Sequence, residues 1–148
     1  MEDISVLVER LCAPDNRLAC AAMRELAAQS AQSAAVYPYF SQFHALLSSS
    51  SSYIRNRALT LFAANARWDM QNLLPGMLAD YLVHITDPKP ITARQCVQGL
   101  PAIAAARPDL VPQILSALKQ ADLSGYADSM RPLLIRDIDS AVQAMGSV

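Results

Sequence analysis

Residues 54–62, IRNRALTLF, and residues 93–101, ARQCVQGLP, follow one pattern that decides the fold. Each stretch has an apolar residue, then arginine, then a small apolar residue three positions later and leucine three positions after that. Apolar positions three and four residues apart share one face of a helix, so each stretch predicts an amphipathic helix. Arg55 and Arg94 hold matching positions, 39 residues apart. The pattern therefore indicates an internal repeat of helical units.

The match is looser at the two ends of the chain. Towards the C-terminus the arginine of the pattern is either Arg131 or Arg136, which lie 37 and 42 residues after Arg94, so the register of the last repeat stays open. Towards the N-terminus only an apolar stripe within residues 18–26 matches. Apolar stripes of helical spacing predict eight helices in four pairs. The pairs are expected at residues 3–30, 36–68, 72–106 and 109–146.

The composition agrees with an all-helical chain. Of the 148 residues, 53% are apolar and only 4 are glycine. Alanine and leucine, which dominate the apolar residues, are strong helix formers, whereas scarce glycine disfavours a turn-rich β fold. The length fits one domain with a substantial core. We therefore expect a single all-α domain over residues 1–148, with at least about 60% helix and no β-sheet.

Prolines and polar residues mark the expected helix boundaries. Asn72, Asp109 and Ser129 each precede a proline by three residues. Proline in the first turn of a helix loses only an N–H that had no partner, so these three residues are predicted helix starts. The serine run at residues 48–52 is interpreted as a connection, with Ser52 as the cap of the next helix. The alternative is a flexible linker.

Arginine after an apolar residue, followed by alanine or valine and then leucine, resembles the second helix of a HEAT repeat. The period of 37–42 residues is slightly shorter than the roughly 40–47 residues of HEAT and armadillo repeats. The resemblance covers most of the chain, from about residue 3 to residue 145. It implies a short right-handed α–α superhelix of about four helix pairs, with the second helices along a concave surface. A helix bundle is the competing fold, but eight short helices are too many for one simple bundle.

Residues 53–69 and 81–96 are also similar to small stand-alone HEAT-like proteins of bacteria. Some of those proteins carry the name SufBD, which would imply iron–sulfur assembly. A cluster scaffold requires grouped thiolates or histidines, whereas Cys12, Cys20 and Cys96 are scattered. An odd number of cysteines without a secretory signal favours reduced thiols. The sequence therefore predicts no cofactor.

Charge and hydropathy argue against two classes of partner. The chain has 12 basic and 13 acidic residues, and a net charge of −1 gives no general attraction to nucleic acid or to an anionic membrane. No apolar run approaches the ~20 residues that span a bilayer, and the acidic start lacks the features of a secretory signal. We expect a cytoplasmic protein without a membrane partner, and nucleic acid is not an expected ligand.

The sequence contains no evident catalytic set. It has no nucleophile elbow, no phosphate-binding glycine loop and no dinucleotide fingerprint. His44 and His84 have no second metal ligand three or four residues away, so no metal site is expected. These features predict a protein that is not an enzyme.

The most polar and aromatic part of the sequence lies between residues 53 and 95, and it contains the candidate partner-binding residues Arg55, Asn65, Trp68 and Arg94. Asn65 is polar where an apolar stripe would continue, and it faintly resembles the asparagine with which armadillo repeats hold a peptide backbone. Arg55 and Arg94, one repeat apart, suit bidentate contacts with acidic groups. The alternative is structural: Arg55 and Asn65 would hydrogen-bond to inter-repeat loops, and Trp68 would close the core at a helix end.

The predicted function is a non-catalytic scaffold or adaptor that binds a protein or peptide partner on its helical-repeat surface. The alternative is a DNA-binding protein or enzyme similar to the HEAT-like DNA glycosylases, which use tryptophan, aspartate and arginine around DNA. Trp68, Asp69 and Arg94 permit this alternative. A DNA-binding surface should carry clustered basic residues, which the net charge of −1 does not favour.

Overall fold

The computed structural model describes residues 3–146, which form eight α-helices joined by turns and four short 3-10 helices. Of the described residues 76% are helical and none lies in a strand, so the all-α prediction is confirmed. The α-helices are α1 (Ile4–Arg10), α2 (Asn16–Gln32), α3 (Phe40–Leu46), α4 (Ser52–Asn65), α5 (Leu74–Leu82), α6 (Pro90–Ala106), α7 (Val111–Gln120) and α8 (Arg131–Gly146). The 3-10 helices are Tyr37–Tyr39, Ala66–Trp68, Val83–Thr86 and Pro108–Leu110.

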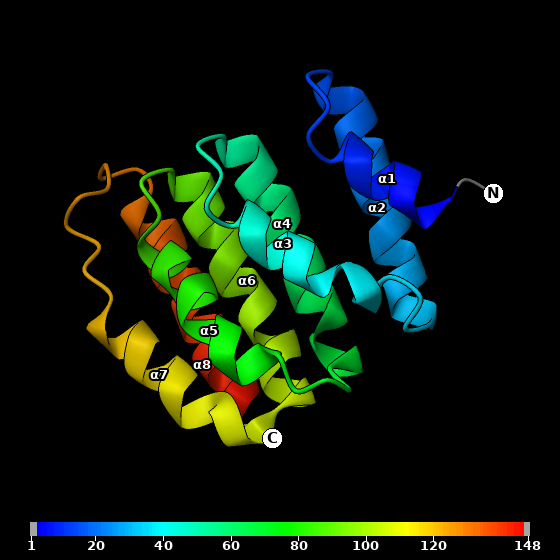
Figure 1. Ribbon diagram of the computed structural model, residues 1–148. Coiled ribbons are helices and arrows are strands. Elements are labelled where there is room, and N and C mark those ends of the chain that lie inside the picture. Colours follow the sequence, from blue (N-terminus) through cyan, green and yellow to red (C-terminus); the bar gives the residue numbers. More distant parts are fainter. Residues whose placement is uncertain (1–2, 147–148) are drawn as a thin grey trace.

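The helices form two layers of four. The even-numbered helices pack in a row in chain order, with α4 between α2 and α6, and α6 between α4 and α8. We call this row the second-helix layer. The odd-numbered helices cover it, since α1 packs on α2, α3 on α4 and α7 on α8, and the 3-10 helix after α5 packs on α6. Four helix pairs therefore follow one another across the molecule (Figure 1).

Side-chain caps begin three of the helices. Asp3 accepts a hydrogen bond from the backbone of α1, and Asp15 accepts two from the first turn of α2. Ser51 accepts one from the backbone of Ile54 at the start of α4. The cap of α4 is therefore Ser51, one residue before the predicted Ser52. The serine run connects α3 to α4 within one stack of helices, as the sequence indicated.

The predicted helix start at Asn72 is wrong. Asn72 has a φ of 56°, a left-handed conformation that turns the chain, and α5 begins two residues later. The N-cap residue Leu73 has no side-chain cap bond, and instead the carboxylate of Asp69, four residues earlier, accepts 2.9 Å hydrogen bonds from the backbone nitrogens of Leu73 and Leu74. Tyr37 donates its hydroxyl to the same carboxylate. Burial, together with this contact, raises the pKa of Tyr37 to about 12.

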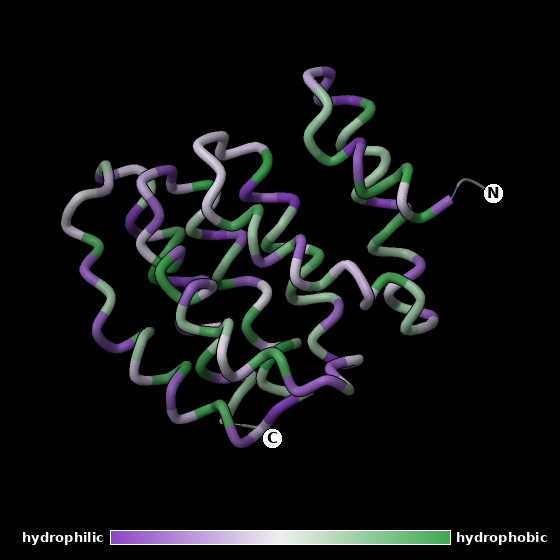
Figure 2. Tube along the Cα trace, viewed as in Figure 1, coloured by the Kyte–Doolittle hydropathy of each residue, from purple (hydrophilic) through white to green (hydrophobic). Residues whose placement is uncertain are grey.

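The buried apolar side chains form two clusters that meet at α4. The first lies among α1, α2 and α3 and includes Leu61 of α4, whereas the larger second cluster extends from α3 to α8 and includes Phe62. Four aromatic rings stack through the second cluster at centroid distances of 5.3, 4.6 and 5.2 Å, in the order Tyr37, Phe40, Phe62 and Tyr81. Hydrophobic positions recur along each helix of the trace, as this packing requires (Figure 2).

Gly99 allows α6 to approach α4 and α5 closely. A Cβ at this position would overlap the hydroxyl of Tyr81 and lie 3.0 Å from the Cβ of Ala63. The Tyr81 hydroxyl is held in place because it donates a 2.7 Å hydrogen bond to the carbonyl oxygen of Cys96. Burial, with a contribution from Cys96, raises the pKa of Tyr81 well above its ordinary value, so the phenol keeps the proton that it donates.

The substitution Gly99→Ala should therefore destabilise the protein by about 1–3 kcal/mol, because overpacking outweighs the usual helical preference for alanine. Gly76→Ala is the matched control, since nothing lies within 4 Å of its added Cβ in α5. That control should be neutral or stabilising by about 0.5–1 kcal/mol. Urea unfolding of both variants measures the difference, and a Gly99→Ala protein as stable as the Gly76→Ala protein would contradict the close approach.

Candidate functional site

Arg55 connects the second helix pair to the third. Its Nε and one terminal nitrogen donate to the two carboxylate oxygens of Asp87, each at 2.9 Å, and the other terminal nitrogen donates to the carbonyl oxygen of Ser49 at 3.1 Å. The Arg55 and Asp87 side chains are only 12% and 1% exposed. A bidentate pair of this kind is strong and directional. The contact is the one that the structural alternative for Arg55 described.

Asp87 forms hydrogen bonds with three further groups. His84 Nδ1 lies 2.8 Å from its carboxylate, the backbone nitrogen of Lys89 donates to it at 2.9 Å, and the Tyr126 hydroxyl donates to its carbonyl oxygen at 2.5 Å. Burial acts to raise the pKa of Asp87, but the hydrogen bonds from Arg55, the Lys89 backbone and His84 outweigh it and hold that pKa below its usual value. Asp87 thus joins parts of the second, third and fourth helix pairs.

Asn65 and Trp68 both contact Ser30 at the end of α2. The Asn65 amide nitrogen donates to the Ser30 hydroxyl at 3.1 Å and to the carbonyl oxygen of Leu61 at 2.9 Å. The indole nitrogen of Trp68 donates to the Ser30 carbonyl oxygen at 2.7 Å. Asn65 is fully buried, and the ring of Trp68 packs against the second apolar cluster. These two residues therefore connect the second helix pair back to the first.

Arg94 connects the third helix pair to the fourth. Its Nε donates to the carboxylate of Asp137 on α8 at 2.6 Å, and its side chain is 32% exposed. Each of the four candidate residues thus makes a contact between successive helix pairs. The structure does not bring them together in one hollow, and their role in partner binding stays a prediction.

One face of the second-helix layer carries two hollows that follow each other along the helices. The lining positions recur every three or four residues on α2 and α4 and continue on α6, so each helix contributes one surface stripe. We call this surface the second-helix face. On α4 and the 3-10 turn that follows, the stripe extends from Tyr53 to Arg67, which is roughly 21 Å at the helical rise.

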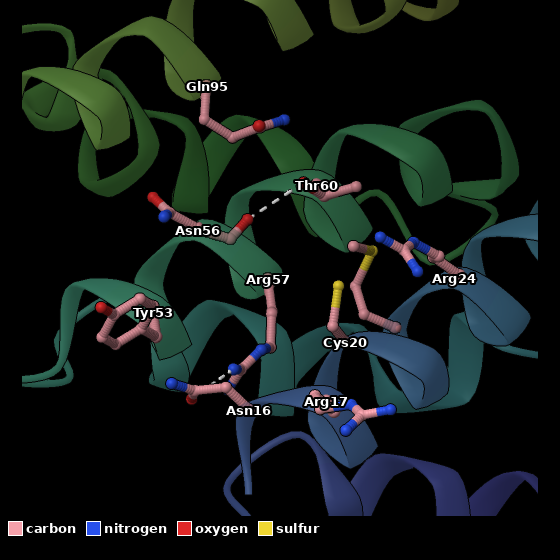
Figure 3. A pocket seen from close by; sticks show the side chains of 10 residues that line it. Asn16, Arg17, Cys20, Arg24, Tyr53, Asn56, Arg57, Thr60 and Gln95 are labelled. Carbon is pink, nitrogen blue, oxygen red and sulfur yellow. Dashed lines mark hydrogen bonds between the residues drawn. The ribbon is translucent and has the colours of Figure 1, made fainter.

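The first of the two hollows, which we call the basic hollow, has a volume of about 520 Å³ and lies at the N-terminal halves of α2 and α4. Figure 3 shows side chains from three helices around it, with Arg17 and Arg24 on α2, Asn56 and Thr60 on α4, and Gln95 on α6. The residues that line the basic hollow are Asn16, Arg17, Cys20, Met23, Arg24, Tyr53, Asn56, Arg57, Thr60 and Gln95.

The second, the alanine groove, has a volume of about 430 Å³ and lies towards the C-terminal ends of the same three helices. Its floor is formed by short methyl side chains, and the only long side chain at its edge is Arg67. The Arg67 guanidinium lies 4.6 Å from the centre of the Trp68 ring, a cation–π contact. The lining residues are Ala27, Ala31, Ala63, Ala64, Arg67, Ala102, Ala105 and Ala106.

The second-helix face is positively charged because its arginines have no carboxylate partner. Arg57 is 6% exposed and donates to the carbonyl oxygen of Leu11 and to Asn16 Oδ1, each at 2.9 Å, and both acceptors are uncharged. Arg17 and Arg24 are exposed, and within residues 3–146 their side chains have no hydrogen-bond or ion-pair partner. No aspartate or glutamate lines either hollow. The arrangement can attract an anionic group.

Sequence reasoning missed Arg17 and Arg24. Their spacing of seven residues places them on one face of a helix, and this signal is readable in the sequence. The position of that face beside the polar stripe of α4 is not readable, because it depends on packing between two helix pairs. Tyr53, Arg57 and Gln95 do lie within the polar and aromatic segment that the sequence singled out.

No family model matches the chain, and no curated protein or solved structure matches it significantly. Within residues 3–146, no helix combines the length and the apolar character needed to cross a bilayer. Over the same residues, no three His, Cys, Asp or Glu side chains are grouped so that they could hold a metal ion.

The substitution Asp87→Asn should lower the free energy of unfolding by about 3–5 kcal/mol at pH 7, because it leaves the largely buried Arg55 guanidinium without its counter-charge. A carboxylate with a lowered pKa contributes stability above its unfolded pKa of about 3.9, and this contribution is lost as the pH falls through the folded value. The difference between wild type and Asp87→Asn should accordingly shrink below about pH 4. Urea unfolding at neutral and acidic pH measures it.

Asp109→Asn is the matched control, since Asp109 pairs with Arg107 at an exposed position. Exposed ion pairs contribute little to stability. The control should lose much less stability than Asp87→Asn, and equal losses would mean that the Arg55–Asp87 contact does not hold the helix pairs together.

Proposed function

We propose that this protein is a non-catalytic scaffold or adaptor that binds a protein partner, as an extended peptide segment, on the second-helix face. The observation that carries the proposal is the alignment of two hollows on one face of three adjacent helices. An extended chain advances at most about 3.3–3.6 Å per residue, so the stripe of roughly 21 Å accommodates about six residues. Such a segment would place one part in each hollow.

The proposal includes a HEAT-like architecture, a short superhelix of helix pairs. It is supported by the order of the even-numbered helices in one row and by the odd-numbered helices that cover this row. In such stacks each pair buries its apolar surface against its neighbours, so the free face of the second helices is available to a ligand. The second-helix face occupies that position.

The DNA glycosylase alternative has less support from the side-chain positions. Trp68 donates its indole N–H to the carbonyl oxygen of Ser30, and Asp69 accepts backbone hydrogen bonds at the start of α5 with a side chain that is 2% exposed. An enzyme that acts on an extruded base needs groups that reach the base. Neither side chain lines a hollow of the second-helix face. We therefore favour protein binding.

Selection from a phage-displayed library of random twelve-residue peptides tests the proposal. We expect the wild-type protein to enrich peptides that bind with micromolar affinity in solution. Ala102→Trp should weaken their binding at least about tenfold, because Ala102 is exposed on α6 and its replacement fills the alanine groove. Isothermal titration with the enriched peptides measures the loss.

Ala79→Trp is the matched control, because Ala79 is also exposed and lines a hollow of about 570 Å³, but lies on α5, in the odd-numbered layer. This variant should bind the enriched peptides as the wild type does. Circular dichroism and urea unfolding confirm that both variants fold. A library that yields no binding peptides, or peptides that bind Ala102→Trp unchanged, would overturn the proposal.

A further inference from the structure

We infer that the basic hollow recognises carboxylate groups of an acidic peptide, so that the partner of the second-helix face is an acidic segment of another protein. The inference rests on the proposed function and adds the chemical class of the partner. It is drawn from the positions of Arg17, Arg24 and Arg57 and from the absence of any carboxylate among the residues that line the hollow.

Several other arginines of the chain form ion pairs with aspartate. Arg55 pairs with Asp87 and Arg94 with Asp137. Arg107 lies beside Asp69 and Asp109, and Arg131 lies beside Asp128. Arg57 is more deeply buried than either Arg55 or Arg94, yet its guanidinium meets only a carbonyl and an amide oxygen. A buried charge without a counter-charge is costly. An anion in the basic hollow would supply the missing counter-charge.

Arg57 is held in place before any ligand binds. Its two 2.9 Å hydrogen bonds, to the carbonyl oxygen of Leu11 and to Asn16 Oδ1, fix the guanidinium between α4 and the start of α2. Figure 3 shows the contact with Asn16 at the edge of the hollow. A cation that is already oriented loses little side-chain entropy when an anion arrives, which favours binding.

Arg17 and Arg24 supply the exposed part of the site. They lie two helical turns apart on α2, which is about 10.5 Å along its axis. Both are exposed and have no side-chain partner within residues 3–146. In a peptide with polyproline II geometry, which has three residues per turn and rises about 3.1 Å per residue, side chains three residues apart lie on the same side and about 9 Å apart. The spacing therefore fits a peptide with acidic residues at every third position.

The alanine groove next to the basic hollow favours a peptide over a nucleic acid. The adjoining alanine groove offers no polar group to a nucleotide other than Arg67. An acidic segment followed by small apolar residues matches both hollows.

A fluorescein-labelled peptide tests the inference directly. The probe has twelve residues, with glutamate at every third position and alanine or serine between them, and the control probe has glutamine in place of glutamate. Fluorescence anisotropy at low salt should show binding of the glutamate probe and none of the glutamine probe. A rise in salt concentration should weaken the complex, since screening reduces the attraction between exposed charges.

The double variant Arg17→Gln/Arg24→Gln should bind the glutamate probe at least about tenfold more weakly than the wild type does. Both side chains are exposed and unpaired, so the variant should fold. The double variant Lys119→Gln/Arg136→Gln removes the same net charge at exposed positions of α7 and α8 and should bind within about twofold of the wild type. If both double variants lost affinity for the glutamate probe to the same extent, net charge alone would explain the effect and the inference would be overturned.

Three further outcomes would also overturn it. One is that neither probe binds at millimolar concentration, and another is that the glutamine probe binds as well as the glutamate probe. The third is that a labelled DNA strand of equal charge binds more tightly than the glutamate probe and depends on Arg17 and Arg24. If library peptides lose affinity with Ala102→Trp but not with the arginine variant, the proposed function survives and only this inference fails. The reverse pattern supports the acidic site without the alanine groove.

Discussion

The burial of α4 on more than one side is the constraint on which the rest of the structure depends. Of its 14 residues 7 are buried, and the adjacent Leu61 and Phe62 belong to different apolar clusters. A helix with one apolar face is covered by one neighbour, whereas α4 requires α2 and α6 on its flanks and α3 above it. The face of α4 that stays open is the one from Tyr53 to Arg67, so the second-helix face is a consequence of this packing.

Polar contacts then align the helix pairs that apolar packing brings together. Apolar contacts are largely non-directional, whereas a bidentate arginine–carboxylate pair requires one geometry. Arg55 with Asp87, and Arg94 with Asp137, each join one pair to the next. Asn65 and Trp68 reach back to Ser30 in the same way. The order of the second-helix layer therefore depends on both kinds of contact.

The arginines of this chain fall into two groups with different consequences. Those that meet aspartate, such as Arg55 and Arg94, have their charge balanced within the molecule. Those of the basic hollow, Arg17, Arg24 and Arg57, have no carboxylate partner for their side chains within residues 3–146. The chain as a whole has a net charge of −1, so this local excess arises from the placement of charges and not from their number. A binding role is best supported for the second group.

The sequence by itself determined the all-helical class and, within residues 3–146, the succession of eight α-helices. The spacing of apolar residues is a local property, and it predicts the all-α class because a helix turns once every 3.6 residues whatever lies beyond it. Local rules also located the connection at residues 48–52. They misplaced the start of α5, since Asn72 satisfied the rule but Asp69, three residues earlier, supplies the hydrogen bonds.

Only the tertiary structure decided which polar residues are free to bind. Arg17 and Arg55 both lie in the first turn of a helix, α2 and α4 respectively. The difference is that Asp87, 32 residues away, pairs with the Arg55 guanidinium, whereas the carboxylate of Asp15 accepts the backbone N–H of Arg17 and leaves its guanidinium without a partner within residues 3–146. Contacts between side chains that far apart depend on how whole helices pack, and the periodicity of a single helix carries no information about its neighbour's charges.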